Sequence, residues 1–186
     1  HTFRFKVLVA AAITAGAIGL FLALGPTLIG AYIAADTSPA DAAATRDYAW
    51  GYLRIMLVGL APFALTQCYA GTLRESGQTV LPMKASMLAM VVNFVFNALL
   101  IFGLGPFPRL GVAGAAIATV LSRFVELGIV VVGAHRSTER YPFLQGVYRS
   151  FAIPRTLVKS IFIRSMPLLV NEMMWGSGQA VLLQCY

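Results

Sequence analysis

The chain has 186 residues, of which 59% are hydrophobic and only 11% are charged. Soluble domains carry about 25% charged residues, so this composition excludes a water-covered globular domain and indicates a protein of the lipid bilayer. The net charge of +7 has no soluble basic face to carry it, so we expect no nucleic-acid partner. Cys68 and Cys185 match no metal-ligand spacing and favour thiols that pack inside the protein, so no cofactor is predicted.

Five apolar segments follow one another, and each is predicted to form a transmembrane helix. A helical crossing needs about 20 predominantly apolar residues. The predicted helices occupy residues 6–33, 48–70, 80–102, 111–134 and 160–186. The predicted fold class is therefore all-α: a polytopic bundle of transmembrane helices without a sheet. Because the chain begins with His1 and ends at Tyr186 inside an apolar helix, we interpret it as a fragment of a longer protein.

Polar stretches separate the predicted helices, and their bases gather on one side. Residues 135–159 form a basic connector, and the bases at residues 4–6 and 74–84 share its side of the membrane. The opposite side has only Arg46 and Arg109. The positive-inside tendency therefore places the first residue and the connector in the cytoplasm. The polar turn at residues 71–79 lacks the Gly-Lys-Ser/Thr ending of a phosphate loop, which excludes that function.

Two carboxamides, Asn93 and Asn97, lie four residues apart inside the third predicted helix. This spacing puts both on one helix face, and an amide without hydrogen-bond partners is expensive in hydrocarbon. The face is therefore predicted to look at other helices or at a water-filled cavity. The next helix opens with small residues, Gly-Val-Ala-Gly-Ala-Ala-Ile-Ala-Thr at 111–119, which let two backbones approach closely. Together they predict a tight hairpin with inward polar groups.

Charged residues within the spans are functional candidates by default. Arg123 and Glu126 are three residues apart and can pair along one helix, so a self-neutralised pair is favoured over direct transport chemistry. Arg54 lies near a helix end, where reaching the headgroups explains it better than a cavity does. Glu172 has no base within a helical turn downstream, and this unpaired carboxylate is a candidate site residue.

The order of these motifs resembles the multidrug and toxic compound extrusion (MATE) transporters, in particular the NorM-like branch. The Asn-x-x-x-Asn helix, a Gly/Pro break and the small-residue helix ending in Thr-x-x-Ser-Arg look like the family's fifth and sixth helices. Residues 74–83 are similar to the loop after its fourth helix. Pro167 followed by Glu172 is similar to the proline and embedded glutamate of its seventh helix.

The resemblance implies a partial MATE fold that covers about the third to the seventh of twelve helices. Residues 1–134 would supply four helices of the N-terminal lobe, 135–159 the cytoplasmic connector, and 160–186 the first helix of the C-terminal lobe. It also implies that Asn93, Asn97 and Thr119 contribute to a cation or substrate site. Glu172 would belong to a second-lobe site that takes sodium. Some members have Asp where Asn97 stands, so the charge of the first site is open.

The function implied is secondary active efflux of small organic, often cationic, compounds in exchange for sodium or protons. Such a protein would be multi-pass in a bacterial inner membrane, with the bilayer, its substrate and the missing helices of the full-length chain as partners. The alternative is a lipid or lipid-linked oligosaccharide flippase of the same superfamily. An enzyme is not expected, because both histidines, His1 and His135, lie outside the predicted spans. A purely structural membrane subunit, with the asparagines binding helices together, is a further alternative.

Overall fold

The structure, a computed structural model, describes residues 2–31, 39–103, 108–136 and 155–185. It contains five helices in these ranges and no strand, which confirms the all-α class. They are α1 (Thr2–Ala31), α2 (Pro39–Glu75), α3 (Val80–Phe102), α4 (Val112–Arg136) and α5 (Arg155–Cys185). The predicted connector falls largely at residues 137–154, outside the described residues.

The bounds of α3 match the prediction, whereas α2 is longer than predicted at both ends. It begins at Pro39 and ends at Glu75, so parts of the two predicted polar connections are helical. Proline suits the first turn of a helix, and the alanines that follow favour helix strongly. At the other end Leu73 is fully buried, and its packing extends the helix through a stretch that polarity alone assigned to a turn.

The fifth helix also differs from its predicted form. It begins at Arg155, directly after Pro154, so the last five residues of the predicted connector are helical. Among the described residues four helices, α1 to α4, are long and apolar enough to cross a membrane. α5 carries the polar residues Asn171, Glu172 and Gln179 among its apolar ones. Its crossing of the membrane stays a prediction.

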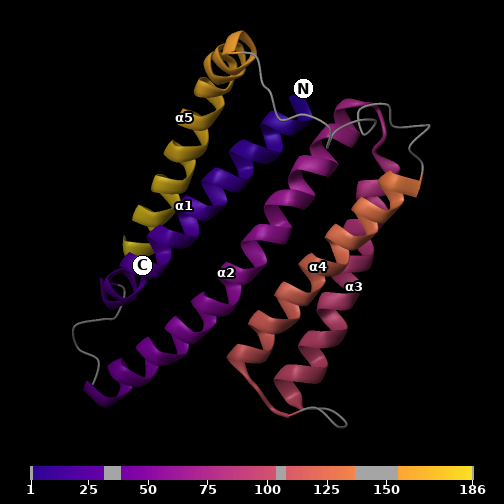
Figure 1. Ribbon diagram of the computed structural model, residues 1–186. Coiled ribbons are helices and arrows are strands. Elements are labelled where there is room, and N and C mark those ends of the chain that lie inside the picture. Colours follow the sequence, from indigo (N-terminus) through magenta and orange to yellow (C-terminus); the bar gives the residue numbers. More distant parts are fainter. Residues whose placement is uncertain (1, 32–38, 104–107, 137–154, 186) are drawn as a thin grey trace.

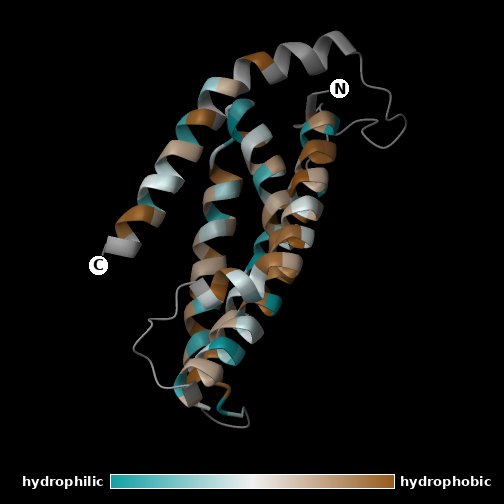
Figure 2. Cartoon of the chain, turned by 90° about the vertical axis from the view of Figure 1, so that its left-hand side faces the viewer, coloured by the Kyte–Doolittle hydropathy of each residue, from teal (hydrophilic) through white to brown (hydrophobic). Residues whose placement is uncertain are grey.

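Helices α1 to α4 run up and down in alternation (Figure 1). α3 and α4 form a closely packed hairpin, α2 packs along α4, and α1 packs along α2. Within the described part of the chain, α5 makes no comparable packing with any of them, and Figure 2 shows it apart from the other four. The polar positions of α3 and α4 are therefore set by the α2–α3–α4 group alone.

Small residues bring α4 close to its two neighbours. A Cβ added to Gly114 would lie 2.7 Å from the carbonyl oxygen of Leu100 on α3. On the other face, a Cβ added to Gly59 of α2 would lie 3.1 Å from the Val120 side chain. The hairpin is closed by Gly103, which ends α3 with φ 67°, a left-handed conformation that glycine adopts at little cost. The predicted close helix approach is confirmed.

A hydrophobic cluster holds the four helices together at one end of the bundle. It joins the start of α1, the end of α2, the start of α3 and the end of α4. The Phe3 and Tyr69 rings meet edge to face with centroids 4.9 Å apart, a favourable arrangement for aromatic pairs. Beside them an ion pair joins Lys6 to Glu75 at 2.6 Å. This cluster holds the ends of α2 and α4 in place. It thereby sets how the polar residues farther along the two helices are aligned with each other.

The outward faces of these helices are apolar. Large exposed side chains run along α1, α3 and α4, among them Ile13, Leu20, Phe94, Phe124 and Val132, and Figure 2 shows hydrophobic residues along most of each helix. Contiguous apolar surface on this scale is unsuited to water and suits contact with lipid chains. The chain is therefore a multi-pass membrane protein with a lipid-facing exterior.

Candidate functional site

The two asparagines of α3 and the threonine of α4 form one hydrogen-bonded group. The Asn97 amide nitrogen donates to the Asn93 side-chain oxygen at 3.0 Å. The Asn93 amide nitrogen in turn donates to the Thr119 hydroxyl oxygen at 3.3 Å. That hydroxyl donates to the Ala115 carbonyl at 2.9 Å. The predicted shared face of Asn93 and Asn97 is confirmed, and Thr119 lies opposite it across the hairpin.

A cavity of about 400 Å³ opens beside this group, between α2, α3 and α4. Its lining is mostly polar: Gln67, Ser86, Asn93, Thr119, Ser122, Arg123 and Glu126, with Ala89 and Met90. Side chains from three helices thus converge on one space within the span. Polar groups that converge in a pocket of this size are the usual mark of a small-molecule or ion site.

At the far end of the cavity lies the charged pair of α4. The Arg123 guanidinium bonds a Glu126 carboxylate oxygen at 3.1 Å, and the Ser86 hydroxyl donates to the other oxygen at 2.7 Å. The predicted pairing is confirmed, but the two partners differ in exposure. The Glu126 side chain is 7% exposed and that of Arg123 40%. Both partners line the cavity, and the positive one is the more exposed of the two.

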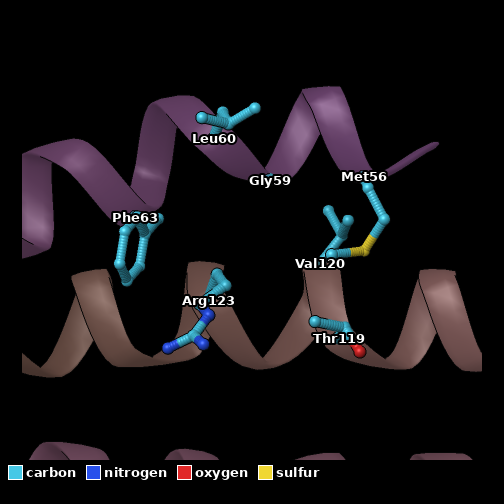
Figure 3. Close-up of a pocket in the computed structure, with 7 residues that line it drawn as sticks. All are labelled: Met56, Gly59, Leu60, Phe63, Thr119, Val120 and Arg123. Carbon is cyan, nitrogen blue, oxygen red and sulfur yellow. The ribbon is translucent and has the colours of Figure 1, made fainter. Parts of the chain in front are cut away.

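A second, apolar pocket of about 250 Å³ adjoins the polar cavity on the α2–α4 side. Figure 3 shows the lining residues of α2 facing those of α4, with Phe63 near Arg123 and Met56 near Val120. The Arg123 guanidinium carbon lies 4.9 Å from the centre of the Phe63 ring, a cation–π contact. Thr119 and Arg123 line both spaces, so the two pockets meet at these residues.

The structure does not bring Glu172 to this group. It lies on α5 with an exposed side chain, and it is not among the residues that line either pocket. Arg54 also stays apart, because its guanidinium lies 4.7 Å above the Trp50 ring and lines neither pocket. Cys68 is buried and free, as predicted. The side chain of Cys185 lies outside the described residues.

Sequence reasoning missed the contribution of α2 and of two serines. Gln67 and Phe63 reach the pockets from α2, and no motif marked them. Ser86 and Ser122 could have been found by helical spacing: Ser86 precedes Asn93 by seven residues and Ser122 follows Thr119 by three. Both intervals return to the same helix face.

The oxygen atoms of the asparagine group suit a weakly held monovalent cation. The Asn97 side-chain oxygen is buried and accepts no hydrogen bond within the described part of the chain. Such an acceptor is costly to leave unpaired, and a cation would satisfy it. Over the same residues, no three His, Cys, Asp or Glu side chains gather as metal ligands. Neutral carbonyl and hydroxyl oxygens would therefore form this part of the site.

These features define an all-α membrane protein with a polar site enclosed by its spans, and comparison with known proteins agrees. The profile of the family described as MatE matches residues 1–99, slightly more than half of the chain. The chain therefore belongs to the MatE family. No solved structure matches it significantly.

Three curated relatives illustrate the similarity. A protein of Shewanella oneidensis described as a FAD transporter is 40% identical over 95 residues, 50% of this chain and 21% of that protein. A probable multidrug resistance protein NorM of Thermotoga maritima is 40% identical over 79 residues, 42% and 17% of the two chains. Its namesake in Streptococcus pneumoniae R6 is 36% identical over 115 residues, 62% and 24%. The chain thus spans about a fifth of the length of these relatives.

Proposed function

We propose that this chain forms part of a secondary active efflux transporter that exports small organic compounds in exchange for sodium or protons. Membership of the MatE family supports the transport class. Several relatives are described as multidrug resistance proteins, whereas another is described as a FAD transporter. We therefore propose that the activity is export of small organic molecules. The descriptions of the relatives do not fix the charge of the substrate, which we infer below from the residues that line the cavity.

The observation that carries the proposal is the polar cavity among α2, α3 and α4. Half-buried amides and hydroxyls from separate transmembrane helices converge there, and a bundle that faced only lipid would avoid the cost of placing them in the membrane. A structural role, in which the asparagines bind helices together, would need only the hydrogen bond from Asn93 to Thr119 across the hairpin. The open space beside them and the unpaired Asn97 oxygen favour a site that accepts a ligand.

In the proposed mechanism, a cation binds at the Asn93, Asn97 and Thr119 face while Glu172 supplies a carboxylate in the second lobe. Binding of the cation stabilises one of two lobe arrangements in which the substrate is held less tightly, so that cation entry drives substrate release outside. Glu172 is exposed on α5, which is suited to a contact with further helices of a longer chain. The apolar side chains of Met56 and Phe63 offer adaptable contact to varied compounds.

The proposed setting is a bacterial inner membrane, with the lipid bilayer and the remaining helices of a full-length transporter as partners. The test uses the full-length protein in vesicles loaded with a fluorescent organic cation, with an imposed sodium gradient, an imposed proton gradient, or neither. We expect efflux to accelerate with one of the two gradients. Dye release that ignores both gradients would overturn the proposal. Gradient-independent scrambling of a labelled lipid would favour the flippase instead.

A further inference from the structure

We propose that Arg123 is the recognition group for the anionic end of an amphipathic substrate, whose apolar body lies in the adjoining pocket against Phe63 and Met56. The inference rests on the proposed export function and names the chemical class of one group of its substrates: organic anions with an aromatic or aliphatic body. It follows from the unequal exposure of the ion pair and from the position of Arg123 between the two pockets.

The first step concerns charge. Glu126 is nearly enclosed, and both of its oxygens are occupied, by Ser86 and by Arg123. Its negative charge is therefore compensated inside the protein. Arg123 has five N–H groups, and of these a single one bonds Glu126 in the described structure. Arg123 lines the cavity and 40% of its side chain is exposed, so the remaining N–H donors are available to a ligand.

The second step concerns geometry. The guanidinium is held from two sides, by the Glu126 carboxylate at 3.1 Å and by the Phe63 ring at 4.9 Å, so its orientation is fixed before a ligand arrives. Preorganised donors cost less to order on binding. A planar fork of N–H groups matches carboxylate, sulfonate and phosphate oxygens. The neighbouring Thr119 and Ser122 hydroxyls and the Gln67 amide add uncharged donors along the same wall.

The third step concerns the body of the ligand. The apolar pocket of about 250 Å³ is lined by Met56, Leu60, Phe63 and Val120 and contains Arg123 as its single charged residue. The polar cavity of about 400 Å³ continues from it past Arg123 and Thr119. Together the two spaces are in the range that drug-sized ligands occupy. An apolar body on one side of Arg123 and an anionic group directed into the polar side would match both linings.

The competing occupant, a cation at Glu126, fits the structure less well. Arg123 lines the cavity beside Glu126 and is the more exposed of the two, so a cation that approached the carboxylate would also approach the guanidinium. The repulsion between like charges is strong where water is scarce. The asparagine face, which has no charged neighbour in its hydrogen-bonded group, is the better place for a cation. The two ends of the cavity would thus receive ligands of opposite charge.

The experiment compares two dyes that share a xanthene core, the anion 5-carboxyfluorescein and the cation rhodamine 6G. Their binding to the purified full-length protein is followed by fluorescence anisotropy at fixed salt. We expect Arg123→Gln to weaken carboxyfluorescein binding at least about tenfold, the usual effect of losing a hydrogen bond to a charged group. Rhodamine binding should be unchanged or stronger. Arg123→Lys should fall between wild type and Arg123→Gln, because it keeps the charge without the fork.

Glu126→Gln supplies a test of opposite sign. It keeps the shape of the side chain and frees the guanidinium from its countercharge, so we expect carboxyfluorescein to bind several-fold more tightly. The matched control is Arg54→Gln, which removes another arginine stacked on an aromatic ring, but one outside both pockets. It should change neither dye. If Arg123→Gln does not fold, the Lys and Glu126→Gln variants still decide the question.

Equal loss of both dyes in Arg123→Gln, or unchanged carboxyfluorescein binding, would overturn the inference. So would displacement of the dye by a few per cent of phosphatidylglycerol in phosphatidylcholine nanodiscs, which would mark the pocket as a site for anionic lipid. Gradient-driven efflux of rhodamine 6G is measured separately. If rhodamine efflux persists while Arg123→Gln leaves carboxyfluorescein binding unchanged, the proposed export function is retained and only the proposed substrate class is rejected.

Discussion

Two regions of the chain treat their polar groups in opposite ways. In the α2–α3–α4 group, Asn93, Thr119 and Glu126 lie inside the helix packing, and each has a side-chain partner. On α5, Glu172 and the residues next to it in the sequence are exposed. In the first region, the partners of the polar groups come from the same three helices. In the second region, the carboxylate of Glu172 would need a partner from another part of the protein to be stable within a membrane.

Mutations should separate the two regions. Changes in the hairpin affect both the folded structure and the site, whereas changes on α5 affect function alone. The largest effect is expected for Gly114→Leu. The new side chain would collide with the backbone of Leu100, 2.7 Å from the added Cβ, and overpacking of this kind costs about 1–3 kcal/mol or more.

The matched control is Gly128→Leu, on the same helix but with open space around the added Cβ. Size-exclusion chromatography and thermal unfolding of the full-length protein would measure both variants. We expect Gly114→Leu to lose most of the monodisperse protein and Gly128→Leu to retain it. Equal behaviour of the two would mean that α3 and α4 do not pack as described.

The next largest effect is expected for Glu172→Gln, and on transport rather than stability. The substitution removes the charge and keeps the size of an exposed side chain, so the unfolding temperature should stay within about 2 °C of wild type. Ion-driven dye efflux should be abolished, because no carboxylate remains to bind the coupling cation. Efflux with unchanged ion dependence would remove Glu172 from the proposed mechanism.

Asn97→Leu should produce an intermediate effect within the hairpin. It removes the i,i+4 hydrogen bond to Asn93 within α3, and such pairs on one helix contribute only about 0.2–0.5 kcal/mol. The substitution also removes the unpaired Asn97 oxygen proposed to meet the cation. We therefore expect near-normal expression with a clear loss of drug resistance in cells. Loss of folded protein in proportion to the loss of resistance would instead assign the asparagines a purely structural role.

The smallest effect is expected for Glu75→Gln, which breaks the ion pair with Lys6. Glu75 is largely exposed there, and surface ion pairs contribute about 0–1 kcal/mol. The unfolding temperature should fall by a degree or two at low salt and converge with wild type at high salt. A large drop that salt does not reduce would show that the end of α2 is fixed by this pair rather than by the hydrophobic cluster around Leu73.

The hairpin could be predicted closely from the sequence, because its signals were local. The spacing of Asn93 and Asn97 and the glycine-rich opening of α4 fixed a shared face and a close approach, and the Arg123–Glu126 interval fixed an ion pair. Helix ends were predicted less well where tertiary packing decided them, as at Leu73. Polarity marked residues 71–79 as a turn, but burial of Leu73 carries the helix to Glu75.

The contribution of α2 to the site could not be predicted, since it depends on which helices become neighbours. Nothing in the residues around Phe63 and Gln67 indicates that α2 lies against α4 rather than against α3. The unequal exposure of Arg123 and Glu126 has the same origin, because Ser86 on α3 and Phe63 on α2 approach the pair from different sides.

The central claim is that the polar face of α3 and α4 lines a water-accessible cavity within the membrane. The most direct test places single cysteines in a full-length protein that carries Cys68→Ala and Cys185→Ala, and treats intact membranes with a small water-soluble thiol reagent. We predict that Thr119→Cys reacts readily and is protected by substrate, whereas Val132→Cys, on the exposed apolar face of α4, reacts slowly. Rapid labelling at residue 132 with none at residue 119 would contradict the claim.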